Sequence, residues 1–211
     1  TDVIPENKFI DIPARQIRKD NVDDFWTDLK AKVGGDAKND TKEGKPRFAY
    51  VTNGVASFWT IASKGVIAAG NKLGVNTDVL MPAEGIADQK RMIEDLITRG
   101  VQGIAVSPID AENQVDLLNQ AAEKTRLITH DSDAPKANRL VYIGMDNYTA
   151  GRMCGELIRE ALPKGGKVML FIGRLEQDNA RLRRQGGIDA LLGRSADNTR
   201  FDPADKVLEG R

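Results

Sequence analysis

Two alternating patterns of apolar residues run from residue 47 to residue 131 and decide what this part of the chain can fold into. Short, nearly continuous apolar segments are typical of buried β-strands. They lie at 47–52, 77–82, 103–108 and 126–131. The segments between them, 57–74, 88–100 and 112–125, keep apolar residues at helical spacing. Strands that alternate with helices on short connections predict a parallel sheet with helices on both faces.

A parallel sheet of this kind also predicts where a ligand binds. Ligands bind in the crevice beyond the carboxyl ends of the strands. The loops at those ends are 53–57, 82–85, 108–111 and 130–134. Any binding residues of this part of the chain are therefore expected in these four loops.

A second, smaller unit follows the extended segment RLVYIGMD at 139–146. Helical spacing returns at 147–166 and 179–193, and KVMLFIG at 167–173 predicts one strand between these helices. One strand is no sheet, and two helices around it leave apolar surface in water. We expect this unit to be incomplete.

The first 46 residues have a different organisation. Residues 9–21 are predicted to be extended, because Pro5 and Pro13 restrict this region to an edge or crossing segment. A short helix is predicted at 21–35, with Phe25, Trp26 and Leu29 on its apolar side. The following GGDAKNDTKEGKP, residues 34–46, has no apolar residue larger than alanine and predicts a flexible linker.

Composition and missing motifs exclude several functions. The 31 basic and 31 acidic residues balance, which argues against nucleic acid or an anionic membrane as the main partner. Cys154 is the only cysteine, predicted to be a small buried apolar residue, and His130 is the only histidine. An internal disulfide is therefore excluded, and a zinc site or catalytic triad is not expected. Phosphate-loop and G-x-S-x-G patterns are absent, and no segment predicts membrane insertion or a signal peptide.

Residues 47–193 resemble periplasmic sugar-binding proteins of the ribose-binding type, which share their fold with the effector domains of LacI-like repressors. Four stretches in the family's order carry the resemblance: VTNGVASFWTIASKGV, ITHDSDAP, YIGMDNYTAGR and NARLRRQGGIDALLG. Residues 9–35 also resemble this family, but the part that they resemble is its carboxyl-terminal end. The resemblance therefore implies a circular permutant in which the linker joins the family's old termini, and which lacks the stretch that completes the second sheet. We therefore interpret the chain as an engineered permutant or as one half of a split protein.

The fold class that follows is α/β, with a parallel-sheet βαβ first lobe of flavodoxin-like type and an incomplete second α/β lobe. The predicted organisation has four parts: the relocated segment 1–33, the linker 34–46, the first lobe 47–139 and the partial second lobe 140–211.

A sugar site needs flat apolar rings against C–H faces and planar polar groups for hydroxyls. Phe58 and Trp59 begin the first helix of the first lobe, where the family places its stacking aromatics. Phe58 keeps the apolar spacing of that helix, so a core role is equally open, whereas Trp59 falls off the apolar side and favours the site. Asn53, which ends the first strand, is a weaker candidate.

The polar groups of the site are expected from both lobes. Asp131 directly follows a strand where the family uses an acid, and Asp133 could share its task; a loop or hinge carboxylate is the alternative. Arg181 matches a family arginine that binds sugar oxygens, because a guanidinium offers several donors in one plane. Because Arg183 and Arg184 lie beside Arg181, a solvent-exposed position on the helix is the alternative for this residue. Asp178 and Asn179 precede that helix as binding residues or caps.

The predicted function is a non-enzymatic receptor for a monosaccharide, held in a cleft between two hinged lobes, without cofactor or metal. The resemblance implies a periplasmic location and transfer of the ligand to an ABC transporter. Open alternatives are a scaffold fragment without binding, a repressor effector domain and an enzyme on the same kind of sheet. The exposed apolar residues of the second lobe predict association with a second chain that carries the missing strands, or self-association.

Overall fold

The computed structural model describes residues 3–33, 41–204, 206 and 208 of the 211-residue chain. These residues divide into two compact units. Unit 1 comprises residues up to Ile10 together with Ile17–Ile143, and unit 2 comprises Asp11–Gln16 and the residues from Gly144 onward.

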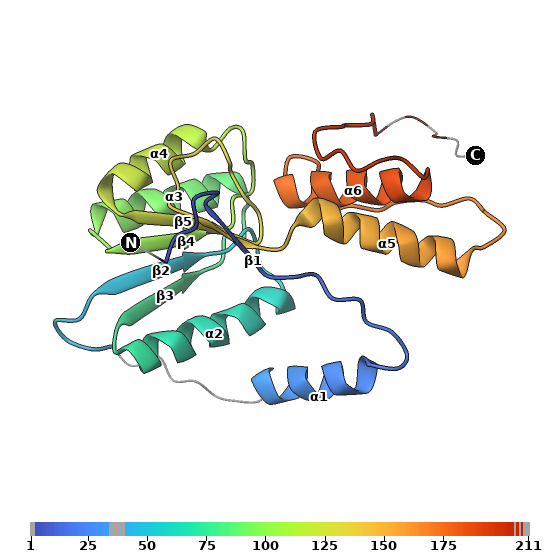
Figure 1. Ribbon diagram of the computed structural model, residues 1–211. Helices are drawn as coiled ribbons and strands as arrows, with labels where there is room; N and C mark the ends of the chain where they lie inside the picture. The colour runs from blue at the N-terminus through green and yellow to red at the C-terminus, as the bar shows by residue number, and fades with distance from the viewer. Residues whose placement is uncertain (1–2, 34–40, 205, 207, 209–211) are drawn as a thin grey trace. The chain divides into compact units, whose positions relative to one another are not determined.

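A six-stranded sheet is the framework on which unit 1 is built (Figure 1). Its order is β1-β6-β5-β4-β2-β3. The strands are β1 (Phe9–Asp11), β2 (Arg47–Val51), β3 (Asn76–Leu80), β4 (Gly103–Val106), β5 (Arg126–His130) and β6 (Tyr142–Gly144). From β3 to β6 all neighbouring pairs are parallel. The parallel sheet predicted from the sequence is therefore confirmed.

Helices cover both faces of this sheet, as the alternating pattern predicts. Unit 1 contains α1 (Val22–Val33), α2 (Ser57–Leu73), α3 (Ile86–Thr98) and α4 (Val115–Lys124). Figure 1 shows α3 and α4 on one face and α2 on the other. Gly74 ends α2 with φ 67°, a left-handed conformation that glycine adopts without strain.

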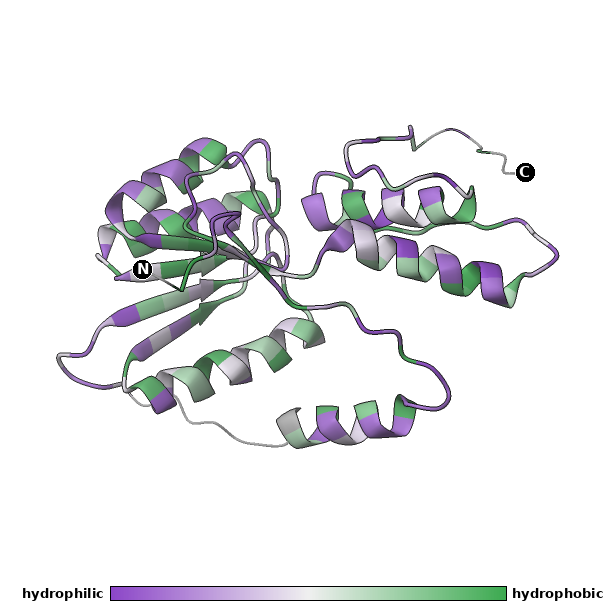
Figure 2. Cartoon of the chain, in the orientation of Figure 1, coloured by the Kyte–Doolittle hydropathy of each residue, from purple (hydrophilic) through white to green (hydrophobic). Residues whose placement is uncertain are grey.

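Alternate strand residues form the core beneath α3 and α4. Ala49 and Val51 of β2, Ile104 and Val106 of β4, and Leu127 of β5 all point to this face. In Figure 2 these central strands are coloured as hydrophobic. The helices contribute fully buried side chains, Ile93, Leu96 and Leu118. Burial of each stabilises the fold by about 1.5–3 kcal/mol.

Strand β1, residues 9–11, forms an edge of this sheet. β1 lies beside β6, where the amide of Tyr142 donates to the carbonyl of Lys8 (2.9 Å) and that of Ile12 to Gly144 (2.7 Å). The rings of Phe9 and Tyr142 stack with their centroids 5.4 Å apart. The predicted extended edge segment is thus present, although β1 is only 3 residues long.

The predicted linker, residues 34–46, is only partly described: residues 34–40 lie outside the described residues. Its last residues are held at the start of β3 by Asn76. The Asn76 side chain accepts from the amide of Lys42 (2.7 Å) and donates to the carbonyls of Lys42 (2.7 Å) and Lys45 (3.1 Å). The described part of the predicted linker is therefore anchored, because one buried amide side chain closes it into a turn.

Unit 2 is built around two helices, α5 (Asn147–Ala161) and α6 (Asp178–Leu191), whose backbones pack closely. A Cβ added to Gly151 would lie 2.1 Å from the carbonyl oxygen of Arg183, and one added to Gly186 would lie 2.1 Å from that of Tyr148. Side chains larger than hydrogen cannot occupy these positions. The pair is therefore joined by backbone contact.

A buried carboxylate ties the residues after α6 to this pair. Asp189, whose side chain is fully buried, accepts from the hydroxyl of Tyr148 (2.6 Å) and the guanidinium of Arg200 (2.7 Å). Gln185 bonds both Asp189 (3.1 Å) and Asp202 (2.6 Å). The segment 194–203 is therefore held by polar contacts.

Two predictions for unit 2 are wrong. Residues 167–173, predicted to be a strand, have no regular secondary structure. A strand requires a neighbouring strand, and none of the described residues supplies one here. Cys154, predicted to be buried, is exposed, because it lies on the side of α5 that no described residue covers.

Candidate functional site

Three polar side chains meet at the carboxyl ends of β2, β4 and β5. The amide nitrogen of Asn53 donates to the hydroxyl of Ser107 (3.2 Å), and that hydroxyl donates to a carboxylate oxygen of Asp131 (3.3 Å). Each residue follows the end of a different strand, so the parallel pairing brings them together. Two of them, Asn53 and Asp131, are predicted site residues.

Two aromatic residues at the start of α2 extend this row. The indole N–H of Trp59 donates to the side-chain oxygen of Asn53 (3.1 Å), and the Trp59 ring is only 4% exposed. Phe58 packs edge-on against it, with centroids 4.8 Å apart, and is 56% exposed. Trp59, which the sequence favoured for the site, is therefore buried, and Phe58, for which core and site were equally open, presents its ring to solvent.

Asp131 has an unusual backbone conformation. Its φ is 60°, and the amide of Ser132 donates to the carbonyl of His130 (2.7 Å), which closes a three-residue turn. This conformation is strained for a residue with a Cβ, and such strain gathers at functional sites. The hydroxyl of Tyr142 donates to the Asp131 carbonyl (3.0 Å) and holds the turn. The carboxylate is therefore aimed by its backbone.

A buried amide fixes the strand ends below the site. Gln89 of α3, which is fully buried, donates to the carbonyls of Thr52 (2.7 Å) and Ser107 (2.8 Å). Its oxygen accepts from the amide of Ile109 (3.2 Å) and the side chain of Gln114 (2.9 Å). All four interactions of one side chain thus set the spacing of the loops that follow β2 and β4.

His130 and Tyr50 lie beneath the aromatic pair. Their rings stack with centroids 4.1 Å apart, and Trp59 meets His130 edge-on at 5.7 Å. Burial lowers the pKa of His130 to about 4, so its imidazole is neutral at pH 7. Burial, followed by the nearby charge of Asp131, raises the pKa of Tyr50. Neither group is set up to exchange protons near neutrality.

Asp133 has a structural environment. Its carboxylate forms a two-pronged ion pair with Arg139 (2.6 Å for each oxygen) and accepts from the hydroxyl of Thr129 (2.6 Å). Both oxygens are bonded and nearly buried. These contacts give Asp133 the task of joining β5 to the segment before β6, so it is not retained in the candidate site.

The three site residues predicted for unit 2 gather at the start of α6. Arg181 donates to the carboxylate of Asp178 (2.8 Å), one turn earlier, and its side chain remains about a third exposed. Asn179, beside them, is buried. The cap of this helix is Gln177, which makes no side-chain capping bond.

Sequence reasoning missed Ser107 and Gln89. Ser107 follows β4 in the same way as Asp131 follows β5, and that shared position could have found it. Gln89 lies inside a helix and gave no local signal. Within the described ranges, no three His, Cys, Asp or Glu side chains group as metal ligands, and no helix has the length and hydrophobicity of a membrane span.

Comparison with known proteins finds similarity to periplasmic binding proteins. The family model of the periplasmic binding protein domain matches residues 48–208. The ribose import binding protein RbsB of Salmonella typhimurium is 29% identical over 151 residues, 70% of this chain and 50% of that protein. The D-allose-binding periplasmic protein of Escherichia coli is 28% identical over 145 residues, 64% of this chain and 47% of that protein.

Solved structures are similar over the same region. A solute binding protein of an ABC transporter from Burkholderia graminis, in complex with D-arabinose, superposes with a TM-score of 0.68 at 31% identity, over 72% of this chain and 53% of that one. GanP, a glucose-galactose binding protein from Geobacillus stearothermophilus, gives 0.67 at 28% identity, over 71% and 54%.

The match is therefore partial on both sides. The chain spans about half the length of the curated relatives it matches. Residues before 48 lie outside the family match, although residues 9–11 form a strand of the same sheet. With the parallel sheet, the polar row at its carboxyl edge and a family match from residue 48 to residue 208, this chain belongs to the periplasmic binding protein domain family.

Proposed function

We propose that this protein is a non-enzymatic sugar-binding protein of the periplasm. The observation that carries the proposal is the row Asn53–Ser107–Asp131 at the carboxyl edge of the sheet, next to the exposed ring of Phe58. A carboxylate accepts sugar hydroxyl protons, and an amide both donates and accepts. An aromatic face suits the C–H face of a pyranose or furanose ring.

The sugar's orientation follows from the row. Asp131 is the only charged member, and charge-assisted hydrogen bonds are about twice as strong as neutral ones. We therefore propose that Asp131 binds two hydroxyls, while Phe58 covers one face of the ring. Trp59 contributes by holding Asn53 through its indole N–H (3.1 Å). Asp131 and Phe58 are the direct contacts, and Trp59 is a positioning residue.

The second half of the site rests on the resemblance to the family alone. By that resemblance, Arg181 contacts the same sugar from unit 2, with Asp178 and Asn179 beside it, and the two lobes close by a hinge. The relatives that bind ribose, allose and arabinose support a monosaccharide as ligand. Transfer to an ABC transporter follows in the same way.

Calorimetric titration tests this proposal. The full chain is titrated with D-ribose, D-allose, D-arabinose, D-glucose and D-galactose. Asp131→Ala should lower the affinity for the sugar by roughly tenfold or more, because a hydrogen bond to a charged group contributes about 1.5–3 kcal/mol. Phe58→Ala should weaken binding as well. Asp116→Ala and Leu73→Ala, at exposed positions of α4 and α2, are the matched controls.

Two results count against it. Equal affinity in Asp131→Ala and Asp116→Ala means that the sugar binds elsewhere. No heat with any of the five sugars, from a chain with native circular dichroism, favours a scaffold fragment without retained binding.

We also propose that residues 1–33 are the family's relocated carboxyl-terminal segment, as in an engineered permutant. Its support is the position of β1 beside β6, in front of a family match that starts at residue 48. Removal of residues 1–33 should lower the free energy of unfolding, because it uncovers Tyr142 and the edge of β6. Unchanged denaturant unfolding after this deletion contradicts an integral role.

A further inference from the structure

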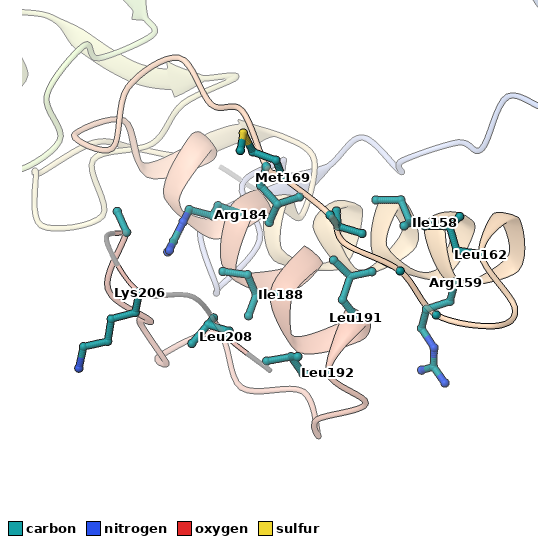
Figure 3. Close-up of a pocket in the computed structure, with 15 residues that line it drawn as sticks. Ile158, Arg159, Leu162, Met169, Arg184, Ile188, Leu191, Leu192, Lys206 and Leu208 are labelled. Carbon is teal, nitrogen blue, oxygen red and sulfur yellow. The ribbon is translucent and has the colours of Figure 1, made fainter. Parts of the chain in front are cut away.

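A groove of about 600 Å³ in unit 2 differs in chemistry from the polar row of unit 1 (Figure 3). Its lining is mainly aliphatic, as at Ile158 and Leu162, and its charged side chains are basic: Arg159, Arg184 and Lys206. None of the described residues that line it has a carboxylate or an aromatic ring. The groove therefore does not combine a flat ring with an acceptor for hydroxyls, and the contacts that position a sugar are those around the polar row.

Two residues other than glycine have a positive φ among the residues that the structure describes. They are Lys8, with φ 52°, and Asp131, with φ 60°. Residues with a Cβ rarely adopt this conformation, and it persists only where neighbouring contacts hold it. Lys8 directly precedes β1, and Asp131 directly follows β5, so they are far apart in the sequence.

Tyr142, the first residue of β6, contacts both of these residues. Its backbone amide donates to the carbonyl of Lys8 (2.9 Å), and its side-chain hydroxyl donates to the carbonyl of Asp131 (3.0 Å). Tyr142 is only 6% exposed, so water competes little for these bonds. One buried residue thus holds the carbonyls of both strained residues.

Arg139 forms a second connection between the same two regions. Its Nη1 donates to the carbonyl of Lys8 (3.3 Å), while its Nε and Nη2 bind the carboxylate of Asp133 (2.6 Å each). We call residues 131–133 the site loop. The carbonyl of Lys8 is therefore connected to the site loop by two routes, one through Tyr142 and one through Arg139.

The start of β1 also orients the Tyr142 side chain. The rings of Phe9 and Tyr142 stack with their planes 16° apart. The turn before Phe9 is closed locally, because the amide of Lys8 donates to the carbonyl of Pro5 (2.9 Å) and the amide of Phe9 to the side chain of Asn7 (3.1 Å). A ring that packs on a fixed ring has fewer orientations open to it. The direction of the Tyr142 hydroxyl therefore depends on β1.

We propose that Tyr142 is a positioning residue for the sugar site and that Phe9 of β1 holds it in place. The inference rests on the proposed function, in which the Asp131 carboxylate binds sugar hydroxyls. Relaxation of Asp131 to a negative φ would turn its carbonyl away from the Tyr142 hydroxyl and its carboxylate away from Ser107. The hydroxyl opposes this relaxation. A strand outside the family match thus contributes to sugar affinity without touching the sugar.

Amide hydrogen exchange of Ser132 tests the first step without any sugar. The Ser132 amide donates to the carbonyl of His130 (2.7 Å), which closes the turn at Asp131. Tyr142→Phe removes only the hydroxyl and keeps the ring that stacks on Phe9. It should speed exchange of the Ser132 amide by roughly three- to tenfold, the equilibrium contribution of one hydrogen bond.

Thr125→Val is the matched control. The Thr125 hydroxyl donates to the carbonyl of Val101 (2.7 Å), so this variant also removes one hydroxyl–carbonyl bond from unit 1. Thr125 directly precedes β5 and lies at the opposite end of that strand from Asp131. The control should leave exchange of Ser132 unchanged. Circular dichroism and urea unfolding check that both variants are folded.

Calorimetric titration with the five sugars named above tests the second step. Tyr142→Phe should lower the affinity for the bound sugar by roughly three- to tenfold, whereas Thr125→Val should not change it. In an Asp131→Ala background, Tyr142→Phe should have no further effect, because the group that it positions is absent. A residue with a merely structural role would not show this dependence on Asp131.

Two variants of Phe9 test the role of β1. Phe9→Ala should change Ser132 exchange and sugar affinity in the same direction as Tyr142→Phe does. Phe9→Tyr, which keeps the stacked ring, should behave as the wild-type chain.

Three results overturn the proposal. One is equal Ser132 exchange and equal affinity in Tyr142→Phe and Thr125→Val. Another is a full loss of affinity from Tyr142→Phe in the Asp131→Ala background. Wild-type behaviour of Phe9→Ala overturns the role of β1. If the wild-type chain binds none of the five sugars, the proposed function fails instead, and Ser132 exchange still decides whether Tyr142 holds Asp131.

Discussion

Mild acid should destabilise unit 1 through a single residue, His130. Its pKa is about 4 in the folded chain, against 6.5 for an ordinary imidazole, because burial opposes the charged form. Between these two values the unfolded chain binds a proton that the folded chain does not, so stability falls as the pH falls. The loss begins below about pH 6.5 and is complete near pH 4. Above pH 7 the contribution is fully present.

The size of the effect follows from the two pKa values. Each unit of separation corresponds to about 1.4 kcal/mol, so lowering the pH from about 7.5 to about 5 should remove roughly 2 kcal/mol from the free energy of unfolding. Ordinary carboxylates stay mostly ionised over this range, since their pKa values lie near 4. The histidine is thus the main group of unit 1 that titrates.

Urea unfolding at the two pH values measures this loss. His130→Phe, which keeps a ring between Tyr50 and Trp59, is the control and should flatten the pH dependence. Because His130 is the only histidine of the chain, its imidazole signal in an NMR titration reports the folded pKa directly. A titration midpoint near 6.5, or equal stability of the wild-type chain at both pH values, would refute the reasoning.

Three further predictions concern buried polar and backbone contacts. Gln89→Leu should lower the free energy of unfolding by about 1–3 kcal/mol, because it leaves the buried carbonyls of Thr52 and Ser107 without donors; Gln120→Leu, at an exposed position of α4, should be nearly neutral in the same urea titration. Gly186→Ala should destabilise unit 2 by about 1–3 kcal/mol or more, since its Cβ meets the Tyr148 carbonyl at 2.1 Å. Gly187→Ala, whose Cβ meets only the Gly151 carbonyl at 3.5 Å, should not, and thermal melting separates the two. Burial raises the pKa of Asp189, but the hydrogen bonds from Tyr148, Arg200 and Gln185 outweigh burial and hold this pKa below its usual value. The stabilisation by Asp189 is therefore present above about pH 4 and is lost at lower pH. Asp189→Asn should lower the free energy of unfolding at pH 7 and reduce the acid sensitivity of the segment 194–203, as measured by hydrogen exchange.

The sheet of unit 1 could be predicted because its signals are local. Residues 47–131 repeat one strand–helix unit, and each strand reads as a short apolar segment that needs no knowledge of its neighbours. The segment 167–173 has an equally apolar sequence, yet it is not a strand. Its state depends on a partner strand, and this information lies outside the segment itself.

The candidate site was predictable in part for the same reason. Asn53 and Asp131 come directly after predicted strands, so the rule for parallel sheets locates them. The burial of Trp59 and the exposure of Phe58 could not be predicted, since they depend on how α2 is rotated against β2 and on the bond from Trp59 to Asn53. Gln89 was missed because its four partners are brought together only by tertiary packing.

The glycine contacts between α5 and α6 bear on how unit 2 could acquire a partner. Backbone packed on backbone has no rotamers to choose from, so the helix pair keeps one geometry whatever covers its other side. A strand that docks there meets a surface whose ordering entropy was already lost when the pair folded. This preorganisation makes the helix pair a fixed template, so that only the residues packed against it still have conformational entropy to lose.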